Sequence, residues 1–150
     1  MFIRSMLLCT ALLFSVFAWG YPKTPNINVA PGSLCTAEDK DFEGYRYDER
    51  IPYCKRNVSY ARKDAICKLY GIYDRTGYTI DHIIPLSAGG SNHDRNLWCQ
   101  SRSIYTGHIE YWVYKQLRDG KMIQAEAVRY ILAHKFNPDG KDHIPSPPSE

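Results

Sequence analysis

An acidic residue and a histidine stand side by side near the middle of the chain, within the stretch YTIDHIIPLSAGGSNHDRNLWCQ. Asp81 offers hard carboxylate oxygens, which suit magnesium or a similar divalent ion. His82 has an ordinary pKa of about 6.5, so its imidazole is largely neutral at pH 7 and can accept a proton from water. A cation on a scissile phosphate, beside an imidazole that activates water, is sufficient for phosphodiester hydrolysis.

The residues that follow this pair predict a loop that returns to it. Neighbouring residues of a regular strand point to opposite faces, so Asp81 and His82 can serve one site only if the chain leaves the strand there. Pro85 and the Gly89-Gly90 pair supply such a departure. Asn96 can both donate and accept hydrogen bonds, so it can pin the loop, fix the His82 ring or give an oxygen to the ion.

Hydrophobic spacing and turn residues predict the elements around this segment. Residues 78–82 and 96–100 are expected to be short strands joined by a loop at 85–95. Two helices are expected at 103–118 and 122–134, separated at Asp119-Gly120. A third helix is expected in the second half of the basic stretch 50–68, capped by Asn57 or Ser59 and ended near Gly71. The pattern predicts an α+β fold.

The N-terminus has the features of a secretory signal peptide over residues 1–20: one arginine, a short apolar run and a small-x-small exit. The run is shorter than the roughly 20 residues of a membrane-spanning helix. Processing would leave 18 basic against 16 acidic residues, too small an excess to indicate a nucleic-acid partner. We expect an extended, proline-containing leader at 21–34, one domain at 35–136 and a disordered tail at 137–150.

Four cysteines remain after processing, an even number that suits an oxidising compartment. None of the spacings is C-x-x-C, so a zinc knuckle is disfavoured and two disulfides are expected. Three pairings are compatible with the sequence. The four residues are Cys35, Cys54, Cys67 and Cys99.

The segment DHIIPLSAGGSN, followed by NLW, resembles the signature of the HNH nucleases, the ββα-metal finger. The stretches LCTAEDKDF, IPYCKRNVS and LYGIY extend the resemblance to the small exported HNH endonucleases of bacteria, over about residues 32–132. The resemblance implies a ββα-metal finger with flanking helices. It also implies that His82 is the general base, Asp81 a metal ligand and Asn96 a brace of the loop or an aid to the metal.

The third position of the signature lies on the helix that follows the second strand. In many HNH proteins it comes about nine residues after the middle asparagine, which here is Tyr105, a poor magnesium ligand. We therefore expect His108, twelve residues after Asn96, to be the second metal ligand. The competing interpretation is that His108 is a half-buried packing residue of an amphipathic helix.

Two cysteines depart from the pattern of this family. Relatives usually read N-L-W-P-Q, whereas Cys99 takes the place of the proline, and Cys67 is also unusual at its position. A bond between these two would explain both, and would leave Cys35 with Cys54. That bond would bring the basic stretch near the site, where its residues could contact phosphates. The expected phosphate-contacting residues are Lys55, Arg56, Arg62 and Lys63.

These observations together predict a secreted or periplasmic, monomeric, metal-dependent HNH endonuclease that cleaves DNA, with RNA as a second substrate, and has little sequence specificity. The expected cofactor is one divalent ion, Mg²⁺, with Mn²⁺, Ni²⁺ and Zn²⁺ as alternatives. No membrane association is expected after signal removal, and the residues indicate no immunity or inhibitor partner. Two alternatives are a non-catalytic nucleic-acid-binding module on the same scaffold and a disulfide-stapled structural or inhibitor protein without a metal.

Overall fold

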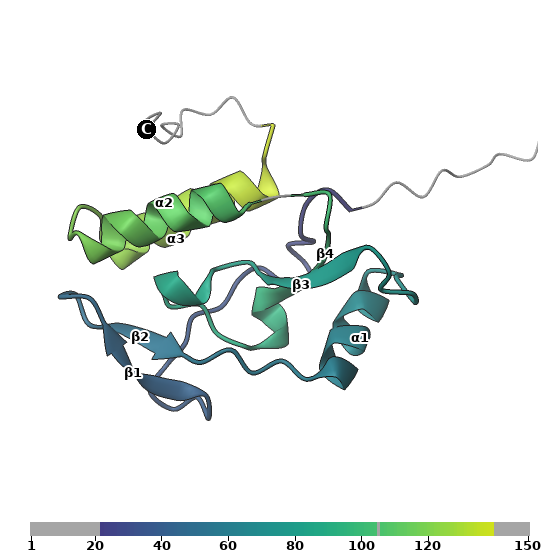
Figure 1. Ribbon diagram of the computed structural model, residues 1–150, viewed down its shortest axis with the longest axis horizontal. Helices are drawn as coiled ribbons and strands as arrows, with labels where there is room; N and C mark the ends of the chain where they lie inside the picture. Colours follow the sequence, from purple (N-terminus) through teal and green to yellow (C-terminus); the bar gives the residue numbers. More distant parts are fainter. Residues whose placement is uncertain (1–21, 105, 140–150) are drawn as a thin grey trace, which may run out of the picture.

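The computed structural model describes residues 22–104 and 106–139. The predicted signal peptide and residues 140–150 of the predicted tail lie outside this part of the chain. Within it, the fold is mixed α+β, as predicted, with two small two-stranded sheets and three α-helices. Figure 1 shows the helical pair α2 (Gly107–Arg118) and α3 (Gln124–Phe136) side by side, apart from α1 (Tyr60–Leu69).

The central element is an antiparallel pair formed by β3 (Tyr78–His82) and β4 (Leu97–Ser101). The strand predicted at 78–82 is confirmed residue for residue. The second strand begins one residue later than predicted, because Asn96 instead ends a short 3₁₀ turn, with its N–H bonded to His93 O at 2.8 Å. Another 3₁₀ turn, Leu86–Ala88, lies between the strands.

A second hairpin, β1 (Phe42–Arg46) with β2 (Ile51–Cys54), was not anticipated from the sequence. Its first strand, with the sequence FEGYR, has no buried residue and a glycine at its centre, so it lacks the buried apolar positions by which a strand is predicted from sequence. Its turn contains no glycine at the two positions that need positive φ. Tyr47 and Arg50 adopt φ values of 61° and 60° there.

Hydrogen bonds of caps and turns set the bounds of the three helices. The Ser59 side chain caps α1, and Gly71, at φ 73°, follows its end, as predicted. Helix α2 starts four residues later than predicted because the chain first turns after β4, with Ile104 N bonded to Ser101 O. Helix α3 starts two residues late, where Glu126 accepts a hydrogen bond from Ile123 N.

Three groups of buried side chains hold the elements together. The first joins α2 and α3 to the 3₁₀ turn after β3 and includes Val113 and Ile131. The second packs α1 on β3 and β4 through Ile66, Ile80 and Leu97. The third sets Ala30, which is fully buried, beside Ile83 and Trp98. Part of the predicted leader, 21–34, therefore packs against the β3–β4 pair.

Two disulfides are present: Cys35 with Cys54, and Cys67 with Cys99. This is the pairing suggested by the two unusual cysteines. The first bond ties the segment before β1 to the end of β2, and the second ties α1 to β4. Both are consistent with folding in an oxidising compartment. Among the described residues, no helix is long and apolar enough to cross a membrane.

We predict that replacing Cys67 and Cys99 together by alanine lowers the free energy of unfolding by about 3 to 4 kcal/mol, because the bond closes a long loop. The two residues are 32 positions apart. Urea unfolding of the oxidised protein and the double variant, followed by circular dichroism, measures the difference. Equal midpoints and slopes would contradict the prediction.

Candidate active site

Asn96 holds the loop between β3 and β4 in place. Its side chain is fully buried. Its oxygen accepts hydrogen bonds from Ser33 N at 3.2 Å and Ile84 N at 2.9 Å, and its Nδ2 donates to Ile84 O and Ser91 O, both at 2.9 Å. The amide therefore uses both of its donors and both lone pairs of its oxygen on the backbone. Of the three roles that the sequence allowed for Asn96, this geometry favours the loop brace.

The close approach inside this loop requires glycine at position 90. A Cβ atom on Gly90 would lie 1.8 Å from Ile84 O and 2.9 Å from Asn96 Nδ2. Any larger residue would push the loop away from the end of β3 and break the bonds of Asn96. The Gly-Gly pair thus serves backbone packing as well as turning.

His82 is the last residue of β3, and its ring is buried in a fixed orientation. Its Nε2 lies 3.0 Å from Asn92 Oδ1. The Asn92 amide cannot turn over, because its Nδ2 donates to Asp41 Oδ2 at 3.1 Å and to Lys55 O at 2.7 Å. The Nε2 atom must therefore carry the proton, which leaves Nδ1 as an acceptor. Among the described residues, no hydrogen-bond partner faces Nδ1.

Sequence reasoning did not single out Asn92. It stands in the glycine-rich loop, where an asparagine is ordinary, and its role depends on contacts with Lys55 and Asp41, which are 37 and 51 positions away in the sequence. Asn57 joins the same network, since its N–H bonds to Asn92 Oδ1 at 3.3 Å and its Nδ2 bonds to Asp41 Oδ1 at 2.6 Å. No sequence signal local to the loop could have revealed this network.

The surroundings of His82 keep its imidazole neutral. Burial lowers the pKa of His82 from its ordinary 6.5 to about 4. The hydrogen bond that His82 Nε2 donates to Asn92 Oδ1 and the charge of Asp81 oppose this shift, while the charges of Arg56 and Lys135 add to it. A neutral ring with a free Nδ1 lone pair is the form that a general base needs.

Asp81 takes its partners from β4 and α3. Its Oδ2 atom accepts hydrogen bonds from Trp98 Nε1 at 3.1 Å and from Lys135 Nζ at 2.7 Å. The strand pairing continues without interruption through Asp81 and His82. The expected departure from the strand at this point is thus not seen, and the two side chains reach different partners. What joins them is Lys135, which also donates to His82 O at 2.6 Å.

Glu110 of α2 completes this cluster and was missed in the sequence. Its Oε1 accepts a hydrogen bond from Lys135 Nζ at 2.6 Å. Burial raises the pKa of Glu110, an effect that the nearby Lys135 charge opposes. A carboxylate from β3, a carboxylate from α2 and a backbone carbonyl therefore converge on one point, which the Lys135 ammonium occupies.

His108, the expected second metal ligand, is exposed in the first turn of α2. It precedes Glu110 by two residues, and residues so spaced lie about 200° apart around a helix, so they do not face the same side. The α2 residue that reaches the Asp81 cluster is Glu110. A ligand role for His108 stays a prediction.

The four expected phosphate-contacting residues differ in their surroundings. Lys55 pairs with Glu43 at 3.4 Å, Arg62 pairs with Asp94 at 2.7 Å, and the Lys63 ammonium lies 4.9 Å from the centre of the Tyr60 ring. Arg56 is exposed, and its charge acts on both His82 and Glu110. Arg56 is therefore the one of the four that the electrostatics link directly to the candidate site.

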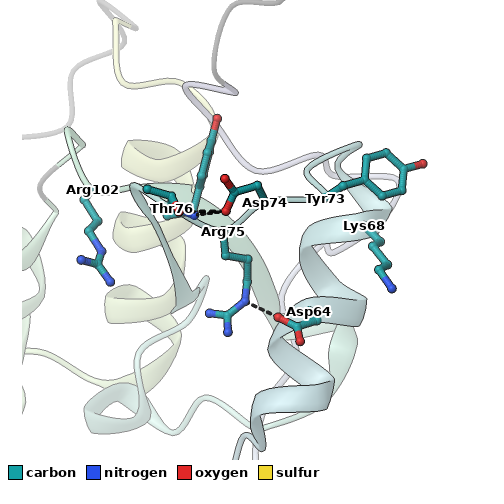
Figure 2. Close-up of a pocket in the computed structure, with 8 residues that line it drawn as sticks. Asp64, Lys68, Tyr73, Asp74, Arg75, Thr76 and Arg102 are labelled. Atoms are coloured by element: carbon teal, nitrogen blue, oxygen red, sulfur yellow. Dashed lines mark hydrogen bonds and ion pairs between the residues drawn. The ribbon is translucent and has the colours of Figure 1, made fainter.

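Neither the group formed by Cys35, Asp39 and Cys54 nor the surface pocket beside α1 offers an alternative catalytic site. The Sγ atoms of Cys35 and Cys54 lie close to Asp39, but they are bonded to each other and supply no thiolate for a metal. A surface pocket lies at the far end of the β3–β4 pair from His82, and Figure 2 shows its polar side chains. There Arg75 pairs with Asp64, and Asp74 accepts hydrogen bonds from Thr76.

Comparison with known proteins gave no match: no family model, no curated protein and no solved structure is significantly similar to this chain.

We predict that buried, neutral His82 makes stability depend on pH. Its native pKa is depressed, so the unfolded chain binds the proton first, and the contribution of His82 is complete above pH 6.5 and lost as the pH falls towards 4. Between pH 7.5 and 4 the contribution of His82 to the free energy of unfolding falls by about 3 kcal/mol. Urea unfolding at both pH values should show a smaller drop in His82→Leu than in the unaltered protein. Equal drops would contradict a depressed pKa.

Proposed function

We propose that this protein hydrolyses phosphodiester bonds in nucleic acid, as an endonuclease of the HNH type. The observation that carries the proposal is the state of His82. The ring is neutral, its tautomer is fixed through Asn92, and the unprotonated Nδ1 has no partner among the described residues. His82 Nδ1 is one of four buried side-chain polar atoms without a partner among the described residues, and it is the one that belongs to an imidazole, which suits a base that accepts a proton from substrate or water.

The arrangement of elements supports the finer fold assignment that the resemblance implies. Two antiparallel strands, β3 and β4, are followed along the chain by helix α2, and the Asp81-His82 pair ends the first strand. This is the order of a ββα-metal finger. The buried Asn96 brace and the Gly90 contact give the loop between the strands a fixed shape suited to such a finger.

The oxygens near Asp81 are of the kind that hold a hard divalent ion such as Mg²⁺. Asp81, Glu110 and the His82 carbonyl converge on one point, which fits an ion in donor type, although the Lys135 ammonium is the cation there. Asp81 and Glu110 would be the ligands. A bound ion would offset the charge that develops on the phosphate and on the departing oxygen.

The residues of the chain then have separate tasks. His82 Nδ1 accepts the proton of the attacking water, and Asn92 keeps the ring turned for that transfer. Arg56 binds phosphate close to His82, while Lys55, Arg62 and Lys63 extend the basic surface along the substrate. Contacts of this type are made to the nucleic-acid backbone, so cleavage is expected to have little sequence preference and to act on DNA and also RNA.

The expected location follows from the disulfides and the N-terminal sequence. Two disulfides form and persist in oxidising compartments, and residues 1–20 have the pattern of a signal peptide. We propose that the protein works in the periplasm or outside the cell.

One observation favours a second candidate function. The position that a catalytic ion would take is held by the protein's own Lys135. A chain with a permanent internal cation there could bind nucleic acid through Arg56 and its neighbours without cleaving it. Plasmid cleavage with Mg²⁺ separates this module from the nuclease.

We predict that His82→Ala lowers the rate of plasmid cleavage by about 10² to 10⁴, the usual effect of removing a general base. Plasmid nicking with Mg²⁺ or Mn²⁺, followed on agarose gels, measures this rate. The matched control is His93→Ala, because His93 lies in the same loop but its side chain is 59% exposed and pairs with Asp39. An unchanged rate in His82→Ala would exclude His82 as the base, and absence of cleavage by the unaltered protein would favour the binding module.

We predict that Arg56→Ala weakens DNA binding and reduces the slope of log affinity against log salt concentration by about 0.9, the value for one phosphate contact in duplex DNA. Fluorescence anisotropy with a labelled duplex at several salt concentrations gives both quantities. Lys68→Ala is the control, since exposed Lys68 lines the pocket at the opposite end of the β3–β4 pair. If both variants lose the same affinity and slope, the Arg56 contact is not specific to the candidate site.

A further inference from the structure

Lys135 is an unusual residue for the position that it occupies. It lies in the last turn of α3, and its side chain is 2% exposed. Lysine is rarely buried to this degree unless its charge is paired. Its ammonium group therefore needs partners inside the protein.

The three donors of the ammonium are fully used. They bond to Asp81 Oδ2 at 2.7 Å, His82 O at 2.6 Å and Glu110 Oε1 at 2.6 Å. These partners come from β3 and α2, the elements that carry the candidate site. Lys135 therefore sits where the oxygen donors expected of a divalent-ion site converge.

The ammonium and a divalent ion cannot share this point. Both would need the same Asp81 and Glu110 oxygens, and their charges would repel each other strongly at that separation in a buried place. A divalent ion can satisfy the two carboxylates only if Lys135 leaves. Lys135 lies one residue before the end of α3. Its side chain can therefore leave the two carboxylates if only the last turn of the helix changes its conformation.

We propose that Lys135 is a built-in competitor of the metal: its ammonium fills the cation position between Asp81 and Glu110, and a divalent ion binds only by displacing it. The inference rests on the proposed function, since it takes Asp81 as a ligand of the ion. It adds a regulatory contact within the chain, because the C-terminal end of α3 then decides how much ion the site takes up.

The first test measures Mn²⁺ binding without any substrate. Lys135→Met keeps a long side chain but removes the competing charge. In the unaltered protein only the molecules whose Lys135 has left the cation position can bind Mn²⁺, which lowers the apparent affinity. The affinity for Mn²⁺ should therefore rise by about tenfold or more in the variant. Electron paramagnetic resonance of free Mn²⁺ during a titration gives the affinity. The control is Lys121→Met, an exposed lysine between α2 and α3, whose affinity should equal that of the unaltered protein.

The second test needs no variant and so does not depend on the folding of Lys135→Met. An amine-reactive reagent is applied briefly with and without saturating Mn²⁺, and labelled peptides are counted by mass spectrometry. Lys135 should resist labelling without the ion and become labelled with it, whereas Lys121 should react equally in both conditions.

Two results would overturn the inference. One is Mn²⁺ bound with Lys135 still protected and with equal affinity in Lys135→Met, which would put the ion elsewhere. The other is no Mn²⁺ binding by either protein, which would remove the ion from this site. If neither protein binds Mn²⁺ but plasmid cleavage persists with chelator, His82 can still act as the base. Failure of the metal inference is therefore distinguishable from failure of the proposed function.

Discussion

A charged ammonium group in the interior must have oxygen partners on all its donors, because an unpaired buried charge costs several kcal/mol. Lys135 meets this condition by joining the end of β3 to α2 from its own place on α3. The three contacts join the end of α3 and the start of α2 to the end of β3. The beginning of α3 is held separately, by the hydrophobic packing of both helices on the 3₁₀ turn after β3 and by the hydrogen bond from Gln124 Nε2 to Ala88 O. The cluster around Lys135 thus links the packing at the end of α3 to the chemistry available to Asp81.

Two asparagine amides determine the other half of the site. Asn96 shapes the loop by four bonds to the backbone, and Asn92 uses that shape to reach both His82 and the segment that leads from β2 to α1. A buried amide with every donor and acceptor used has one orientation, so the ring tautomer follows from bonds made on the far side of the amide. The Cys67–Cys99 bond and the packing of α1 on β4 support this arrangement, since they fix the strand that begins directly after Asn96.

Local patterns in the sequence were sufficient for the elements that obey local rules. The strand at 78–82, the Ser59 cap and the turn at Gly71 follow from alternation, capping and positive φ, and all three are confirmed. The cysteine pairing was also predicted, because Cys67 and Cys99 both depart from the pattern of the nuclease family that the sequence resembles. The β1–β2 hairpin was not predicted, since its first strand has no buried residue. Three residues of the candidate site were not predicted for another reason: Glu110, Lys135 and Asn92. Each acts through contacts with residues distant in sequence, and none stands in an unusual local context.

The charges of the cluster set a condition on any phosphate ligand. With both carboxyl groups ionised, Asp81 and Glu110 carry two negative charges and Lys135 one positive charge, so the cluster is left with one net negative charge, which repels a phosphodiester. Arg56, whose charge acts on His82 and Glu110, opposes that repulsion from the solvent side. Exchange of the ammonium for a divalent ion would neutralise the carboxylates completely and release the Lys135 charge. Substrate binding and cation exchange would then favour each other, because each is reciprocally linked to the charge of the same two carboxylates.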